Sequence, residues 1–257
     1  MPCFGTSQRT RDNAEKLCSG LGITLKEVNI TQTVLSHFSD IGQSPEDHGV
    51  AFENSQARER TQVLMDMANQ QNGLVIGTGD LSELALGWAT YNGDHMSMYG
   101  VNGSIPKTLV RHLVSFWAES CENSDVSNVL FDILDTPVSP ELLPPEEGRI
   151  SQATEDLVGP YILHDFFIYH TLKNGFGPAK VLAMAQKAFE GQYDRAFILR
   201  WMKVFYRRFF SQQFKRSCMP DGADVTGISL SPRGGFAMPS DAVSRLWLDE
   251  VNRLEAE

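Results

Sequence analysis

The segment Gly73-Leu-Val-Ile-Gly-Thr-Gly-Asp-Leu-Ser-Glu83 carries the strongest structural signal in the chain. Its consecutive apolar residues lie between glycines, which predicts a short strand, Gly73–Gly77, buried on both faces. The chain then turns on Gly77 and Gly79, and a helix is predicted over Asp80–Leu86. This order is typical of a parallel sheet whose carboxyl edge binds ligands, where free helix N–H groups face anions.

Hydrophobic periodicity on both sides of this segment predicts further helices and strands. Upstream we expect helices over Thr10–Leu21, Thr33–Phe38 and Asn54–Gln71, and a strand over Ile23–Ile30. Downstream we expect a loop over Trp88–Ile105 and helices over Lys107–Glu119, Tyr161–Leu172, Pro178–Phe189, Ala196–Phe214 and Asp241–Leu254. Four prolines in Pro137–Pro145 predict a linker or surface loop. The chain therefore divides into an α/β core over 1–120, a linker over 121–152 and a helical region over 153–257.

Composition narrows the class of protein. The 257 residues include 22 Lys and Arg and 32 Asp and Glu, giving a net charge of −10, which argues against nucleic-acid binding through bulk charge. A hydrophobic fraction of 42% is enough for a buried core. No apolar run reaches the roughly 18 residues of a membrane helix, and no secretory signal is visible. Four dispersed cysteines (Cys3, Cys18, Cys121, Cys218) predict reduced thiols. We therefore expect a cytoplasmic protein without membrane or nucleic-acid partners.

The spacing Asp80-x-x-Glu83 has two interpretations. It fits a capping box, in which the two side chains satisfy backbone donors at a helix start. It also fits contact with a ligand or a metal ion. The two roles are compatible for Asp80 but compete for Glu83. The neighbouring pattern Gly77-x-Gly79-x-x-Ser82 is one residue short of a dinucleotide fingerprint.

Three other features carry open alternatives. The aromatics Trp88 and Tyr91 fit either a hydrophobic plug or a stacking platform for a flat ring. Lys107 stands at a predicted helix start, where a cation is disfavoured, so it is either a solvated charge or a phosphate contact. The basic residues that end with Lys215 and Arg216 fit either a favourable charge at a helix C-terminus or a phosphate contact.

Several motifs in a consistent order resemble the NAD synthetase family, with the closest similarity to the synthetase portion of the glutamine-dependent enzymes. The motifs are Met1-Pro-x-Phe-Gly-Thr-Ser-x-Arg-Thr10, Glu53-Asn-Ser-Gln-Ala-Arg-Glu-Arg60, Gly77-Thr-Gly-Asp-Leu-Ser-Glu-Leu-Ala-Leu-Gly-Trp-Ala-Thr-Tyr-Asn-Gly-Asp94, Pro106-Lys-Thr-Leu109, Phe214-Lys-Arg-Ser217, Leu230-Ser-Pro-Arg-Gly234 and Pro239-Ser-Asp241. The resemblance covers essentially the whole chain. It implies an α/β fold with a Rossmann-like parallel sheet of the adenine nucleotide alpha hydrolase type.

The resemblance also implies a ligase reaction. ATP adenylates the nicotinate carboxylate of deamido-NAD, and ammonia derived from glutamine then displaces AMP to form NAD. Carried over by motif, ATP would contact Thr78 and Lys107, and magnesium would contact Glu83. Deamido-NAD would contact Asn54, Arg58, Glu83, Trp88, Ala89, Thr90, Tyr91 and Lys215. In the family the deamido-NAD site lies at a dimer interface, so the resemblance implies a homodimer or a larger homo-oligomer. No catalytic residue is assigned.

Two departures from the family pattern are visible. The motif Ser-Gly-Gly-x-Asp-Ser, which grips the ATP phosphates after the first strand, does not occur in this sequence, and neither does an amidotransferase domain. We therefore expect a sheet without its first, central strand, unpaired backbone and exposed apolar surface. The chain alone is expected to be inactive. The alternatives are a non-catalytic dinucleotide-binding remnant, a partner of a polypeptide that supplies the phosphate loop, or another ATP pyrophosphatase ligase; the loop Trp88–Asp94 argues against the last.

Overall fold

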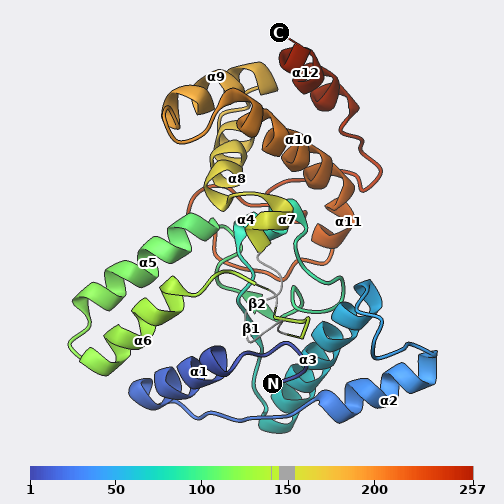
Figure 1. Cartoon of the computed structure of the whole chain (residues 1–257), viewed down its shortest axis with the longest axis vertical. Coiled ribbons are helices and arrows are strands. Elements are labelled where there is room, and N and C mark those ends of the chain that lie inside the picture. The colour runs from blue at the N-terminus through green and yellow to red at the C-terminus, as the bar shows by residue number, and fades with distance from the viewer. Residues whose placement is uncertain (140, 145–153, 257) are drawn as a thin grey trace. The chain divides into compact units, whose positions relative to one another are not determined.

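The computed structural model describes residues 1–139, 141–144 and 154–256. The chain forms two compact units. Unit 1 comprises Met1–Gly73, Thr90–Asp94 and Leu109–Thr154, and unit 2 comprises Leu74–Ala89, His95–Thr108 and Glu155–Glu257. Figure 1 labels the elements of both units. The expected sheet segment Gly73–Gly77 and the expected loop Trp88–Ile105 are both divided between the two units.

Unit 1 is helical. It contains α1 (Gln8–Leu21), α2 (Thr31–Ile41), α3 (Val50–Gln71), most of α5 (Lys107–Ser120) and α6 (Ser124–Asp135). The helix α1 begins where the Ser7 side chain accepts a hydrogen bond from the Thr10 N–H. It ends at Gly22, whose φ of 66° is the left-handed conformation that glycine adopts most easily. The helices α1, α2, α3 and α5 confirm the predicted helices, with α2 and α3 longer than expected.

An aromatic cluster forms the core beside α2 and α3. Ile30, Val34, Phe38 and Phe52 are buried together. The ring of Phe4 lies 5.1 Å from that of Phe52, between centroids, and stacks on Phe38 at 6.3 Å. The N-terminal segment is thereby fixed to this core.

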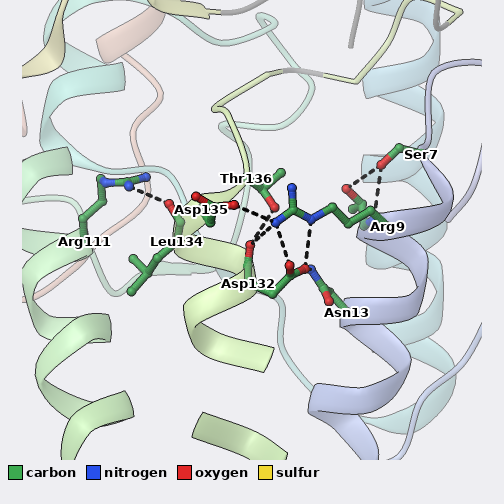
Figure 2. Close-up of polar contacts among 9 residues, drawn as sticks. Ser7, Arg9, Asn13, Arg111, Asp132, Leu134, Asp135 and Thr136 are labelled. Carbon is green, nitrogen blue, oxygen red and sulfur yellow. Dashed lines mark hydrogen bonds and ion pairs between the residues drawn. The ribbon is translucent and has the colours of Figure 1, made fainter. Parts of the chain in front are cut away.

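An ion pair joins α1 to α6, as Figure 2 shows. The Arg9 guanidinium donates to the Asp132 carboxylate at 2.6 Å and reaches Asp135 at 3.2 Å. The Asn13 amide also donates to Asp132, at 2.6 Å. The hydrogen bonds from Arg9 and Asn13 lower the pKa of Asp132 to about 2. Beneath this polar layer, Ala118, Val126 and Leu130 are buried and pack with Leu17.

Unit 2 contains a short parallel sheet. Strand β1 (Ile76–Gly77) pairs with β2 (Tyr99–Gly100), with Ile76 opposite Tyr99. The strand β2 lies in the range expected to be a loop, so that expectation was wrong for these two residues. After β1 the chain turns into α4 (Leu81–Leu86), as predicted. The parallel direction of the sheet is also as predicted.

The C-terminal region of unit 2 is a helical bundle (Figure 1). The elements are α7 (Thr154–Val158), α8 (Tyr161–Ile168), the π-helix η1 (Tyr169–Lys173), α9 (Pro178–Ala188), α10 (Arg195–Ser211), α11 (Gln213–Arg216) and α12 (Arg245–Ala256). Helix α10 packs against α8, α9 and α12. The bundle core includes the buried residues Leu163, Phe167, Ile198, Met202 and Phe205. The predicted helical character of this region is confirmed.

The Arg216 side chain is fully buried at the end of α11. It donates to the backbone carbonyls of Leu84, at 3.0 Å, and Ala85, at 3.0 Å, near the end of α4. It also donates to the Phe209 carbonyl and to the Gln213 side chain, the latter at 2.7 Å. A positive charge at the carbonyls of a helix C-terminus is electrostatically favourable. Burial lowers the pKa of Arg216 to about 10, so the side chain stays charged at neutral pH.

Two strand predictions need correction. The segment Ile23–Ile30 contains no strand, and Ile23 and Leu25 are 55% and 46% exposed. In the segment predicted to be buried on both faces, Val75 is buried, but Leu74 and Ile76 are 59% and 50% exposed. A strand requires a ladder of backbone hydrogen bonds to a neighbour, whereas at this segment the Ile30 N–H donates to the Pro2 carbonyl at 3.3 Å without a strand being formed.

The region expected to be a linker also contains a helix, since α6 lies within 121–152. Of Pro137–Pro145, the described residues form no helix or strand, and Pro140 and Pro145 lie outside them. Among the described residues, no helix has both the length and the apolar character needed to cross a membrane. All four cysteines are free thiols.

Candidate functional site

A cavity of about 250 Å³ lies in unit 2, at the carboxyl ends of β1 and β2. Glycines and serines form much of its lining, among them Gly77, Gly79, Gly100, Ser97 and Ser104. A Cβ atom added to Gly77 would lie 2.3 Å from the Ser97 Oγ, so only glycine fits there without movement. Ligands of open parallel sheets bind at this edge. The lining is therefore made largely of small residues, whose backbone lies close to the space that a ligand would occupy.

The helix α4 begins with a capping box. The Asp80 Oδ1 accepts from the Glu83 N–H at 2.9 Å, and the Glu83 Oε2 accepts from the Asp80 N–H at 3.2 Å. The capping interpretation of Asp80-x-x-Glu83 is therefore confirmed. Each carboxylate still has an oxygen that serves a second partner.

That second partner is the Lys107 ammonium. Its Nζ lies 2.7 Å from the Asp80 Oδ2 and 2.7 Å from the Glu83 Oε1. The Lys107 side chain is 16% exposed, and those of Asp80 and Glu83 are 2% and 25% exposed. The two carboxylates compensate for the position of Lys107 as the first residue of α5, where the helix dipole disfavours a cation.

Burial dominates the electrostatics of this cluster. Burial and the neighbouring charge of Glu83 raise the pKa of Asp80 to about 7, while Lys107 opposes this shift. Burial would lower the pKa of Lys107, but the charges of Glu83 and Asp80 raise it instead. Lys107 is therefore held as a cation. The phenol ring of the buried residue Tyr161 faces its ammonium, with Nζ 5.5 Å from the ring centroid.

The Trp88 end of the aromatic loop is fixed by cations of the helical bundle. The Arg208 guanidinium lies 5.2 Å from the Trp88 ring centroid and donates to the Leu86 carbonyl at 2.8 Å. The Lys215 Nζ donates to the carbonyls of Gly87, at 2.8 Å, and Ala89, at 2.6 Å. These contacts fix the backbone of the loop where it leaves α4.

The remaining predicted residues of the aromatic loop lie in unit 1. The Thr90 hydroxyl donates to the Asn54 side-chain oxygen at 2.8 Å. The Arg58 guanidinium donates to the Tyr91 carbonyl at 3.3 Å. Side chains on α3 therefore hold this part of the loop. The boundary between the two units falls between Ala89 and Thr90.

The predicted site residues thus form separate groups. Glu83 and Lys107 are in direct contact, whereas Thr78 is exposed on the turn between Gly77 and Gly79. The lining of the 250 Å³ cavity, taken over the described residues, includes both glycines but not Thr78, Glu83, Trp88 or Lys107. Within the part of the chain that the structure describes, no group of three or more His, Cys, Asp or Glu side chains is arranged to hold a metal ion.

Sequence reasoning missed Asp165, which lies beside the Lys107 cluster. Its carboxylate contacts Ser82 and Thr108, the residues next to Glu83 and Lys107 in the chain. No local motif marks Asp165. A chain separation of 57 residues from Thr108 conceals the contact.

Two solved structures share the fold of this chain. A glutamine-dependent NAD(+) synthetase from Cytophaga hutchinsonii superposes with a TM-score of 0.75, covering 98% of this chain and 40% of that chain at 20% identity. An NMN synthetase from Francisella tularensis superposes with a TM-score of 0.55, covering 75% of this chain and 74% of that chain at 22% identity. The fold is the one found in these pyridine nucleotide synthetases.

Sequence comparison then gives the family. Residues 1–124 match the family model described as NAD synthase. Glutamine-dependent NAD(+) synthetases of Mycobacterium leprae and Mycobacterium tuberculosis are each 41% identical over 98% of this chain, which corresponds to 41% of their own length. The chain belongs to the NAD synthase family and spans about two fifths of the length of these relatives.

Proposed function

We propose that this chain is the synthetase portion of an enzyme that converts deamido-NAD to NAD. The observation that carries the proposal is the 41% identity to glutamine-dependent NAD(+) synthetases over 98% of the chain. In the proposed reaction, a nicotinate carboxylate oxygen attacks the α-phosphorus of ATP and pyrophosphate leaves. Ammonia, normally derived from glutamine, then attacks the acyl carbon, AMP leaves and the amide of NAD forms.

Lys107 and Thr78 would bind ATP in this reaction. The Lys107 ammonium is held as a cation in a partly buried site, where its attraction for phosphate is weakly screened. To reach a phosphate it would leave one of its two carboxylates, and Asp80 or Glu83 would keep the other contact. Thr78 lies on the glycine turn beside the cavity, where it would donate to the same nucleotide.

Glu83 would also contact magnesium. A nucleotide-bound Mg²⁺ requires one or two carboxylates in addition to phosphate oxygens, and Glu83 offers one carboxylate at the start of α4. When bound, the ion would neutralise phosphate charge. The residues for deamido-NAD would be Asn54, Arg58, Glu83, Trp88, Ala89, Thr90, Tyr91 and Lys215. Of these, Lys215 would act by holding the Ala89 backbone as well as by its charge.

The proposed assembly is a homodimer or a larger homo-oligomer. We further propose that an additional strand covers the exposed residues Leu74 and Ile76, since β1 is short and these side chains remain open. The same exposed residues favour a second candidate function, in which the chain binds the dinucleotide without turnover and pairs with a polypeptide that supplies the phosphate loop. A cytoplasmic location is proposed with either function.

The test is NAD formation from deamido-NAD, ATP and ammonium by the protein expressed from its full reading frame. Lys107→Ala should lower kcat/KM for ATP by about 100-fold or more. Lys187→Ala is the matched control, because Lys187 is an exposed lysine that pairs with Glu190, and the activity of this variant should equal that of wild type. Deamido-NAD binding by calorimetry without any NAD formation would favour the second candidate. Absence of both binding and turnover would contradict both.

A further inference from the structure

The Asp165 carboxylate, on α8, contacts two residues of unit 2 that lie at the starts of α4 and α5. Its Oδ2 accepts hydrogen bonds from the Thr108 N–H at 2.9 Å and from the Thr108 hydroxyl at 2.7 Å. Its Oδ1 accepts from the Ser82 hydroxyl. Thr108 lies in the first turn of α5 and Ser82 in the first turn of α4, so one side chain holds the starts of two helices.

These contacts lead directly to the Lys107–Glu83 pair. The Lys107 N–H donates to the Ser82 Oγ at 2.8 Å, and the Ser82 hydroxyl donates to Asp165. Ser82 therefore connects the Asp165 carboxylate to the backbone of Lys107. Ser82 also lies between the capping residues Asp80 and Glu83 of α4. The Asp165 carboxylate therefore fixes the backbone at Lys107 and the backbone at Glu83. Its own oxygens face Ser82 and Thr108.

A neutral residue would not reproduce this arrangement. All three groups that face the Asp165 carboxylate donate, so both of its oxygens must accept. An asparagine at this position would place an NH₂ group against one of these donors. Burial is unfavourable for the ionised carboxylate and raises the pKa of Asp165, which the hydrogen bonds from Ser82 and Thr108 oppose.

We propose that Asp165 is a positioning residue that holds Lys107 and Glu83 in the geometry needed for adenylation, without contacting a substrate itself. This inference rests on the proposed function, since that function places Lys107 and Glu83 at ATP. A loss of this hold would displace the Lys107 ammonium and the Glu83 carboxylate while leaving the Trp88–Tyr91 loop attached through Lys215 and Asn54. Adenylation and dinucleotide binding should therefore respond differently.

The experiment compares Asp165→Asn with wild-type protein expressed from the full reading frame. We expect kcat with ATP to fall on the order of 10- to 100-fold, the loss typical of a misplaced catalytic group. The Kd for deamido-NAD, measured by calorimetry, should rise by less than about 5-fold, a change worth about 1 kcal/mol, because Glu83 is the one proposed dinucleotide contact that Asp165 positions. A general loss of folding would weaken both. The control Asp156→Asn, an exposed acid on α7, should change neither value.

A second pair of variants tests the same hold if Asp165→Asn does not fold. Thr108→Val removes one hydrogen bond to Asp165 at nearly constant volume, whereas Thr108→Ser keeps it. Thr108→Val should lower kcat and Thr108→Ser should restore it. Wild-type kcat in folded Asp165→Asn, or equal kcat in the two Thr108 variants, would overturn the positioning role. Wild-type activity in Lys107→Ala would instead overturn the proposed ATP contact of Lys107, and absence of NAD formation by the wild-type protein would overturn the proposed function.

Discussion

At the scale of single residues, the pairing of Lys107 with two carboxylates decides how the site can respond to a ligand. The ammonium is 2.7 Å from both Asp80 and Glu83, so an anionic ligand has to compete with two negative charges. Buried charges are weakly screened, and this competition will persist at moderate salt. A change at Asp80 should therefore affect both stability and ligand binding.

The first prediction concerns Asp80→Asn. The folded pKa of Asp80, about 7, lies above the usual value near 3.9, so its ionisation between these values destabilises the fold as pH rises. Asparagine preserves the cap at the Glu83 N–H but does not ionise. The free energy of unfolding of the variant minus that of wild type should therefore increase from pH 4 to pH 7, by at most a few kcal/mol.

Urea denaturation at pH 4.5 and pH 7.5 measures this difference. A stability difference that stays constant between the two pH values would contradict the raised pKa of Asp80.

The same variant should also change ligand binding. Removal of one competing carboxylate should strengthen the binding of inorganic triphosphate, and Ser115→Ala, a surface change on α5, serves as the control.

Sequence alone identified part of this arrangement and missed the rest. The capping box followed from its three-residue spacing, and Lys107 stood out because a cation is unusual at a helix start. The ion pair between them is tertiary, since 24 residues separate Lys107 from Glu83. Asp165 gave no signal, because a carboxylate in a helix has the same appearance whether it faces solvent or a buried hydroxyl.

At the scale of elements, the contact of α1 with α6 depends on Asp132 (Figure 2). Because Arg9 and Asn13 lower its pKa to about 2, its ionised form stabilises the fold above pH 4, and this contribution is lost as pH falls toward 2. Asp132→Asn should therefore lower the urea midpoint at pH 7. Asp135→Asn, which removes the longer contact to Arg9, is the matched control and should have the smaller effect. Equal effects of the two variants would contradict the assignment.

Helix α8 contains a second group whose lowered pKa makes the fold less stable in acid. The His164 Nε2 donates to the Val158 carbonyl at 2.7 Å, and the side chain is fully buried. Burial lowers the pKa of His164 to about 4. The unfolded chain binds a proton near pH 6.5 and the folded chain only near pH 4, so stability falls as pH decreases through this range, by about 3 kcal/mol in total. His164→Gln should lose less stability than wild type between pH 7 and pH 4.5, measured by urea denaturation. An identical loss would exclude His164 as its source.

The elements differ in how well sequence predicts them. Amphipathic helices such as α1 and α10 have a period that is visible in the chain itself, and both are present close to their predicted positions. A strand is stable only beside a partner, so the apolar residues of Ile23–Ile30 could not establish a strand alone. The strand β2 has only two residues, too few for any period.

At the scale of the whole molecule, the 257-residue chain by itself should form NAD very slowly. The sequence contains no Ser-Gly-Gly-x-Asp-Ser phosphate loop, and the chain spans 41% of the Mycobacterium leprae relative. With ammonium supplied, we expect less than one hundredth of an ordinary enzyme's roughly 10 turnovers per second. Turnover above that limit would show that the loop is dispensable.

The family was recognisable from sequence because several motifs occur in one order along the entire chain. Their three-dimensional grouping was less accessible. The stretch from Trp88 to Tyr91 was treated as one feature, yet its first two residues belong to unit 2 and the others to unit 1. Adjacent residues can pack in different units because their contacts come from residues distant in the sequence, which a local pattern does not reveal.

The sealed Arg216 guanidinium has a lasting electrostatic effect on its surroundings. It binds the carbonyl of Leu84, a residue that lines the cavity at the sheet edge. The side chain is closed off from water, so dissolved ions screen its contacts with the carbonyls only weakly. The anchor between α11 and the end of α4 should therefore persist at salt concentrations that abolish the attraction between surface charges.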